Sequence, residues 1–403
     1  MLTGKSPARL GFEFVTQYET ENFRWSDQKW RSKFEGRSLV PPPFKLNLPL
    51  AEVTLAEMLE TQNYQTAIAG KWHVSTHYKE YNGWNPDFGP SKQGFQWTAN
   101  TFGAFKPAKQ EDILNTNEFP EDALTDRAID FINEKHTKPF FLYVSHYYVH
   151  TPLDKRVKWL TDKYKQKAKA GESAQRIIYA ANVETMDHFV GKLLDAIDSA
   201  GIRENTMVIF TSDNGGMPEF AYNRPFRGSK WNLYEGGVKI PMIVRWPGVV
   251  KEGSTSNSPV IQTDFMPTFY EISGGTGVKP GPDGFSIVPL LKGLESQKIN
   301  ERSLVWHFPY YHPEGAKYEP AGNEIGYEDG FISKTKPQSA IRKGNLKYIY
   351  FYELKKGELY DLAKDPGEKH DLSNSRPEET KRMKSALMTY LIKVKARFPQ
   401  QNL

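Results

Sequence analysis

The chain has 403 residues, of which 38% are hydrophobic and 25% charged, and its formal net charge is +5. It contains no cysteine, which excludes disulfides, thiolate metal sites and a cysteine nucleophile among these residues. The basic residues form no long run, so we predict no nucleic-acid partner. No apolar stretch reaches the length of a membrane-spanning helix, and we predict no membrane partner.

Short apolar runs alternate with amphipathic segments over the first part of the chain. We predict buried strands at 64–70, 139–145, 206–211 and 240–246, and helices at 55–62, 126–134 and 173–200. Strands that alternate with helices favour an α/β fold, with a mostly parallel sheet and helices on both of its faces. We assign this domain to residues 1–285.

The pattern changes in the last third of the chain. Alternating segments follow one another closely at 303–308, 339–342 and 346–352, with a turn at Lys343-Gly344-Asn345. An amphipathic helix is predicted at 377–398. Residues 286–403 are therefore expected to form a second subdomain, with a small antiparallel sheet and a helix.

Polar side chains follow three of the predicted parallel strands, at the point where each strand ends. Lys71 and His73 follow the first strand, His150 follows the second, and Asp213 and Asn214 follow the third. Because open parallel sheets bind ligands at the carboxyl ends of their strands, we expect these residues to share one site.

Each of these residues also has a plainer explanation. The oxygens of Asp213 and Asn214 suit Ca²⁺ or Mg²⁺, but the two residues could equally form an ordinary Asx-Gly turn. Lys71 and Lys230 could be solvated lysines, and His73 and His150 could be structural histidines. Taken together, two lysines, two histidines and a cation would hold a tetrahedral oxyanion, which favours a metal-assisted hydrolase of phosphate or sulfate esters.

Five motifs in order resemble the sulfatase family, of the arylsulfatase A-like type in the alkaline phosphatase superfamily. They are Tyr64 to His73, Pro139 to Pro152, Thr211 to Gly216, Lys230 to Gly237, and Glu358 to Glu368. The resemblance covers nearly the whole chain. One departure is Asn63, which stands where the family pattern usually has glycine.

The resemblance implies a role for each site residue. Asp213 and Asn214 would bind Ca²⁺, while Lys71 and Lys230 would hold sulfate oxygens. His73 would orient the nucleophile and help to expel sulfate, and His150 would contact sulfate and assist the leaving alcohol. The family's nucleophile is formylglycine, made from Cys or Ser in a C-x-P-S-R motif, and further acidic metal ligands come from the family's first strand.

This chain departs from the family pattern at its beginning. It has neither the C-x-P-S-R or S-x-P-S-R motif nor the first strand with its acidic pair. The stretch Met1-Leu2-Thr3-Gly4 resembles the end of that first signature, which would put the nucleophile about seven residues upstream of Met1. We therefore expect an N-terminally truncated chain that is nearly inactive, because losing a nucleophile costs about a million-fold in turnover.

Two other functions remain open. The chain could be an inactive pseudoenzyme that binds sulfated glycans, or a related phosphoesterase or phosphonate hydrolase with a Thr or Ser nucleophile. The expected partner is a small-molecule or glycan sulfate ester, and the stretch from His307 to His312 could recognise a sugar or simply pack in the sheet. Members of the family that this chain resembles are usually secreted or periplasmic.

Overall fold

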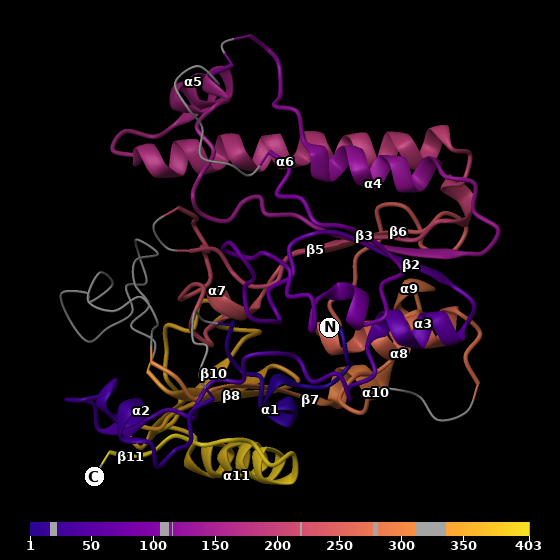
Figure 1. Ribbon diagram of the computed structural model, residues 1–403. Helices are drawn as coiled ribbons and strands as arrows, with labels where there is room; N and C mark the ends of the chain where they lie inside the picture. Colours follow the sequence, from indigo (N-terminus) through magenta and orange to yellow (C-terminus); the bar gives the residue numbers. More distant parts are fainter. Residues whose placement is uncertain are drawn as a thin grey trace.

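The computed structural model describes residues 1–16, 22–104, 113–114, 116–217, 220–276, 281–311 and 336–402. Figure 1 shows helices stacked above and below strands β2 to β6, with a second sheet and α11 at the bottom of the view. Among the described residues, no helix is both long enough and apolar enough to cross a membrane.

The first sheet is parallel and has the strand order β3-β2-β4. It contains β2 (Gln65–Gly70), β3 (Trp97–Ala99) and β4 (Phe140–Ser145), with β4 pairing along the whole of β2. Helix α3 (Leu55–Thr61) leads into β2, and its predicted cap is confirmed: Thr54 and Glu57 form a capping box. Asn63 then turns the chain with a φ of 64°, which explains why glycine also suits this position.

Helices cover both faces of this sheet, as predicted. On one face, α4 (Ala123–Asn133) and α6 (Ala174–Ser199) pack against β2 and β4. On the other face, α3 and α8 (Phe265–Ile272) form a shared core with Phe141 of β4. Helix α4 begins three residues earlier than predicted, because the Asp122 side chain caps it by accepting from the Thr125 amide.

Strands β5 (Val208–Thr211) and β6 (Met242–Arg245) form a separate antiparallel pair. The prediction of a parallel run therefore fails at β6. A parallel return needs a crossover that packs on the sheet, usually a helix. In the described residues of this connection, the single helix is the one-turn α7 (Glu235–Val238). Within the described ranges, no strand pairing joins β5 to β4.

The C-terminal sheet is antiparallel throughout, with the order β10-β9-β8-β7. Its strands are β7 (Ser303–Phe308), β8 (Gln338–Lys343), β9 (Leu346–Phe351) and β10 (Lys356–Asp361), the last of which the sequence patterns missed. Helix α11 (Pro377–Lys393) covers one face through Leu387 and Leu391, and it ends five residues before the predicted limit. We refer to β7–β10 and α11 as the C-terminal subdomain.

The remaining elements are short or peripheral. They are α1 (Pro7–Leu10), α2 (Gln28–Ser32), α5 (Lys158–Lys167), α9 (Val288–Leu291), α10 (Gln297–Glu301), and the pair β1 (Leu39–Val40) and β11 (Gln400–Gln401). Ala8 of α1 packs in the core of the C-terminal subdomain, so the N-terminal residues tie the two sheets together. The boundary between residues 285 and 286 stays a prediction.

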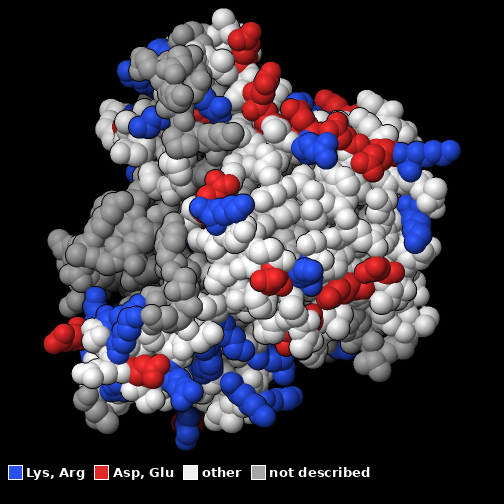
Figure 2. Space-filling view, in the orientation of Figure 1, with Lys and Arg blue, Asp and Glu red and all other residues white. Residues whose placement is uncertain are grey.

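Charge is unevenly distributed over the face of the molecule that Figure 2 shows. Figure 2 shows acidic and basic side chains over the upper helical layer, many lysines and arginines below, and a wide uncharged region between them. The basic residues at the bottom lie where Figure 1 places the C-terminal subdomain.

Candidate active site

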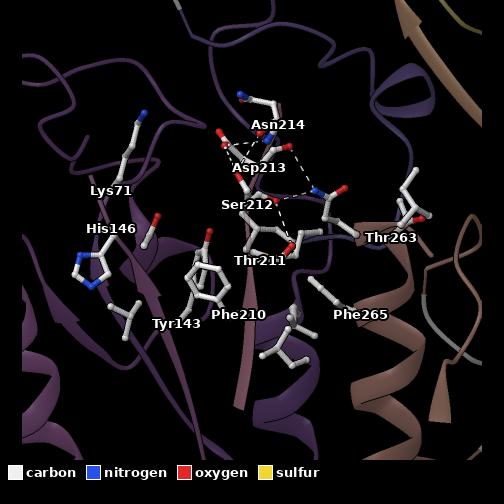
Figure 3. Close-up of a pocket in the computed structure, with 18 of the residues that line it drawn as sticks. Lys71, Tyr143, His146, Phe210, Thr211, Ser212, Asp213, Asn214, Thr263 and Phe265 are labelled. Atoms are coloured by element: carbon white, nitrogen blue, oxygen red, sulfur yellow. Dashed lines mark hydrogen bonds between the residues drawn. The ribbon is translucent and has the colours of Figure 1, made fainter. Parts of the chain in front are cut away.

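The carboxyl ends of β2, β4 and β5 meet at one edge, where the predicted site residues gather. The amide of Lys71, just after β2, donates to the carbonyl of Ser145 at the end of β4, at 2.8 Å. Asp213, just after β5, is close enough to affect the pKa values of both Lys71 and His150. Figure 3 shows Lys71, Asp213 and Asn214 at the same end of the pocket. β5 therefore runs in the same direction as β2 and β4.

Gly70 allows the chain to turn toward the site at the end of β2. Its φ is +100°, and a Cβ there would lie 2.2 Å from the Ser145 carbonyl oxygen. No other residue fits this conformation and this contact. The glycine therefore sets the direction in which Lys71 leaves the sheet.

Lys71 is held in an unfavourable electrostatic position. Burial and the neighbouring Lys230 lower the pKa of Lys71 to about 8, and Asp213 opposes them. The lysine is still mostly charged at pH 7. Two cationic side chains kept close together within a partly buried cavity create a site that favours an anion.

His150 lies beside Lys230 and is neutral at pH 7. Its Nδ1 contacts the Thr151 carbonyl at 2.8 Å, and its Nε2 lies 3.4 Å from the Lys230 Nζ. A carbonyl oxygen only accepts, so Nδ1 carries the proton and the Nε2 lone pair faces the ammonium group. Burial, then Lys71 and Lys230, lower the pKa of His150 to about 4.

His73 is also held as a neutral imidazole. Its Nε2 donates to the Thr16 carbonyl at 3.2 Å, which leaves Nδ1 as the acceptor. Burial, followed by Lys71 and His77, lowers the pKa of His73 to about 3. The His77 ring lies 5.1 Å from the His73 ring, and burial and Lys71 lower its pKa as well.

Asp213 and Asn214 form a tight polar turn after β5. The Asp213 carboxylate accepts from the Asn214 amide at 2.9 Å, and Gln262 donates to the carbonyls of Ser212 and Asp213. The oxygen atoms of these two side chains are ligands of the type that Ca²⁺ prefers. They are too few to complete a site, because Ca²⁺ binds about six to eight oxygen ligands. In the described part of the chain, no group of three or more His, Cys, Asp or Glu is placed to hold a metal.

Two glycine-rich loops bring Lys230 over this turn. The Gly215 amide donates to Gly237 at 3.0 Å, and a Cβ on Gly215 would lie 1.8 Å from the Gly236 carbonyl oxygen. The Lys230 amide in turn donates to Gly216 at 3.1 Å. The glycines are required because the two backbones touch, and this contact positions Lys230.

A buried ion cluster anchors the Lys230 loop to the C-terminal subdomain. Lys347 of β9 lies 2.8 Å from Glu235 and 3.0 Å from Glu368, and Glu368 also accepts from the Glu235 amide at 2.6 Å. Burial raises the pKa of Glu368 to about 7 despite the lysine. Burial tends to raise the pKa of the Glu235 carboxyl as well. The nearby Lys347 ammonium has the larger effect, so the pKa of Glu235 is lowered.

The structure brings all six predicted site residues to one edge, but their catalytic and metal-binding roles stay predictions. Sequence reasoning missed His77 and Gln262, although the spacing of His73 and His77 could have drawn attention to the first. His307 is buried and contacts Ser339 and the Arg397 carbonyl, as the packing alternative expected. His312 lies outside the described residues.

The stretch Lys5 to Arg9 has a structural role. Ser6 caps α1, and Arg9 pairs with Asp283 through its Nε at 2.7 Å. Gly4 has a φ of +61° and packs against Met266, so this turn has no space for a larger side chain.

Comparison with known proteins decides the family. The family model described as Sulfatase matches residues 1–275. The chain belongs to the sulfatase family. A sulfatase of Formosa agariphila is 34% identical over 296 residues, which is 68% of this chain and 50% of the relative. Human arylsulfatase A is 27% identical over 415 residues, which is 92% of this chain and 72% of the relative.

Human arylsulfatase H is 30% identical over 292 residues, covering 65% of this chain and 46% of the relative. This chain thus spans about half the length of arylsulfatase H and of the Formosa protein.

Solved structures confirm the predicted fold class. Ps i-CgsB in complex with k-i-k-neocarrahexaose has a TM-score of 0.68 at 23% identity, covering 97% of this chain and 80% of that chain. A protein in complex with its substrate, D-glucosamine-2-N,6-O-disulfate, has a TM-score of 0.62 at 18% identity, covering 98% and 87%. The sulfatase fold is therefore alkaline phosphatase-like, with a small antiparallel C-terminal sheet.

Proposed function

We propose that this site binds the sulfate group of a sulfated carbohydrate and serves hydrolysis of the ester to sulfate and an alcohol. The observation that carries the proposal is the grouping of Lys71, Lys230 and His150 at the carboxyl edge of the sheet in a sulfatase family member. The sugar assignment is supported by solved relatives whose bound molecules are a neocarrahexaose and a glucosamine disulfate.

Lys71 and Lys230 bind and orient the sulfate oxygens. Burial and then repulsion by Lys230 lower the pKa of Lys71, and an anion between the two lysines offsets both effects, so anion binding and lysine protonation support each other. A charge pair at about 4 Å is worth roughly 4 kcal/mol at an effective dielectric near 20. The lysines are thus the main source of affinity.

His150 responds to the same anion. The empty site holds it neutral, whereas a sulfate beside its ring offsets Lys71 and Lys230 and raises the pKa of the imidazole. A protonated Nε2 could then donate to the leaving alcohol oxygen. His73, with Nδ1 as acceptor, is suited to orient an attacking hydroxyl.

Calcium and formylglycine belong to the proposal only by resemblance. Asp213 and Asn214 would supply part of the shell of a Ca²⁺ ion, which would stabilise negative charge on the sulfate, but their number alone does not satisfy it. Formylglycine supplies the nucleophile in this family, and the 403 residues contain neither the C-x-P-S-R nor the S-x-P-S-R motif from which it would be made. We therefore propose that these residues bind the ester but turn it over very slowly.

Binding is tested by titrating the chain with glucosamine 6-sulfate in a calorimeter at pH 7. We expect Lys71→Ala and Lys230→Ala each to weaken binding by about tenfold or more. The matched control is Lys251→Ala, at an exposed lysine after β6, which leaves affinity unchanged.

Two further ligands separate the alternatives. Glucosamine without sulfate should not bind, because the lysines would then lack an anion. Glucosamine 6-phosphate carries more negative charge at pH 7 than the sulfate ester, so the two lysines should bind it at least as tightly. Release of phosphate from this ligand that is clearly faster than release of sulfate from glucosamine 6-sulfate would replace the proposal by the phosphoesterase alternative. Equal binding by the wild type and both site variants would show that sulfate is recognised elsewhere.

A further inference from the structure

Trp231 directly follows Lys230 in the loop that brings this lysine over the active site. Its φ is +80°, in a region that residues with a Cβ rarely adopt and that glycine adopts readily. Among the described non-glycine residues with a positive φ, Trp231 has the largest value and is the one aromatic residue. Such a backbone conformation persists only where the surrounding contacts hold the residue in place. The contacts of the indole therefore indicate what this conformation supports.

The Trp231 indole belongs to a cluster of stacked aromatic rings. The Phe14 ring lies 5.6 Å from it with an angle of 21° between the ring planes, and the Phe308 ring of β7 lies 6.1 Å away. Phe14 is buried, and it also stacks on Phe44 at 4.8 Å and on Phe308 at 5.5 Å. Ring contacts of this kind favour particular orientations as well as burying apolar surface. The indole is thus held in its orientation by residues outside its own loop.

The Lys230 ammonium lies over this indole. Its Nζ is 5.2 Å from the centroid of the Trp231 ring and 3.4 Å from Nε2 of His150. A cation within about 6 Å of an aromatic face is attracted by the ring quadrupole, and tryptophan gives the strongest attraction. Unlike a carboxylate, the ring adds no negative charge. It therefore holds Lys230 beside Lys71 without cancelling the positive potential that attracts an anion.

The segment that supports the indole also holds His73. Phe14 stacks on the indole, and two residues later the Thr16 carbonyl accepts from His73 Nε2 at 3.2 Å. Glu13 of the same segment accepts from Arg397 Nε at 3.3 Å, which anchors the segment to the chain that follows α11. One short stretch of chain therefore fixes the loops that carry two predicted site residues relative to each other.

We propose that Trp231 is a positioning residue for the sulfate site, and that its indole holds the Lys230 ammonium where it contacts a sulfate oxygen. Without the ring, the flexible four-carbon side chain of Lys230 would sample other rotamers, and anion binding would first have to order it. The indole acts through the lysine and needs no contact of its own with the sulfate. This inference rests on the proposed function, because it requires that Lys230 binds the anion.

The first experiment compares substitutions at position 231 by titration with glucosamine 6-sulfate in a calorimeter at pH 7. Trp231→Leu keeps an apolar side chain but removes the ring, and it should weaken binding by about threefold. Trp231→Phe keeps a ring and should recover part of this loss. Trp231→Gly suits the backbone φ but has no ring, so it should bind as weakly as the leucine variant. Wild-type affinity in the glycine variant would overturn the proposal, because the ring would then be unnecessary.

Trp97→Leu is the matched control. The Trp97 ring of β3 also lies beneath a cation, the Arg127 guanidinium at 5.5 Å, but this pair lies outside the lining of the active-site cavity. Its loss should leave the affinity for glucosamine 6-sulfate unchanged. An equal loss of affinity in Trp97→Leu and Trp231→Leu would show that the effect comes from general destabilisation, and it would overturn the proposal.

A second experiment alters the charge distribution of the ring but barely its shape. Tryptophans with one, two and three fluorine atoms are placed at position 231 alone, and each fluorine weakens the negative face of the indole. We expect the affinity to fall stepwise, by about threefold across the series, while urea unfolding shows that the fold is retained. A role in packing alone predicts no such trend. Equal affinities across the series would contradict the proposal.

A double substitution tests whether the indole acts through Lys230. In Lys230→Ala, adding Trp231→Leu should change the affinity little, because no ammonium remains for the ring to hold. A further threefold loss would mean that the indole contacts the ligand itself, and it would reject a positioning role. If the wild type does not bind the sulfate, or if Lys230→Ala binds as tightly as the wild type, the proposed function fails and this inference fails with it. If only the changes at position 231 have no effect, this inference alone is rejected.

Discussion

The two sheets of this sulfatase differ in how completely they are built. In the C-terminal subdomain every strand from β7 to β10 is joined to its neighbour by a full register of pairs, and Leu359, Leu387 and Leu391 are 0% exposed. In the α/β sheet, β4 and β5 are not paired with each other within the described residues, and both border a cavity. The candidate active site lies at the end of the interrupted sheet.

This difference indicates a division between stability and function. The C-terminal subdomain has a continuous core and reaches the active site through the Lys347 cluster and the Lys230 loop. The α/β sheet supplies the chemistry at its strand ends but contributes less packing along β4 and β5. Substitutions in the two regions should therefore have different consequences.

The largest effect is expected from Lys347→Met, which removes the cation between Glu235 and Glu368. Two buried carboxyls would be left facing each other, and breaking such a group costs about 3–5 kcal/mol of unfolding free energy. Urea unfolding measures this loss of unfolding free energy. The affinity for glucosamine 6-sulfate should also fall in the variant, because the loop that carries Lys230 is no longer anchored. Lys343→Met, at the exposed end of β8, is the control; a loss equal in both variants contradicts the argument.

A pair of leucine truncations compares the two cores directly. Leu387→Ala, in a fully buried position of α11, should lower the unfolding free energy by about 3 kcal/mol. Leu142→Ala, at a half-buried residue of β4 beside the cavity, should cost about 1 kcal/mol, because less surface leaves water on folding. Similar losses at both positions would mean that the sheets are equally well packed.

Much of the fold could be predicted because its signals are local. The Thr54 cap, the 173–200 helix and the strand at 139–145 each depend on a few neighbouring residues, and the structure places them within a residue or two. The direction of β6 could not be predicted, since an apolar run looks the same whichever way its neighbour runs. β10 was missed because its sequence, Lys356 to Asp361, is largely polar.

The candidate site was predictable in position but not in electrostatic state. Chain order shows that Lys71, His150 and Asp213 follow strands, and parallel strands bring them together. Nothing in the sequence shows that Lys230 lies 3.4 Å from His150, or that burial keeps both site histidines neutral. The cavity was equally hidden, because it depends on which strands fail to pair.

The smallest expected effect is the change in unfolding free energy with pH that comes from the two site histidines. The folded-state pKa values of His73 and His150, about 3 and about 4, lie below the ordinary 6.5 of an unfolded chain. At a pH between the folded-state and the unfolded-state pKa, the unfolded chain binds more protons at each histidine than the folded chain does. The stability that each histidine contributes is therefore fully present above pH 6.5 and is lost as the pH falls toward 4.

Lowering the pH from 7.5 to 5 should therefore cost about 1–2 kcal/mol for each histidine. Carboxyls such as Glu368, whose raised pKa acts in the opposite sense, also titrate in this range, so the total change is ambiguous. The difference between the wild type and His150→Gln isolates the contribution of His150: the variant should lose less stability on acidification. Equal losses would show that burial, Lys71 and Lys230 do not lower the pKa of His150 in the folded chain, and the proposed response of this imidazole to a bound sulfate would then lose its basis.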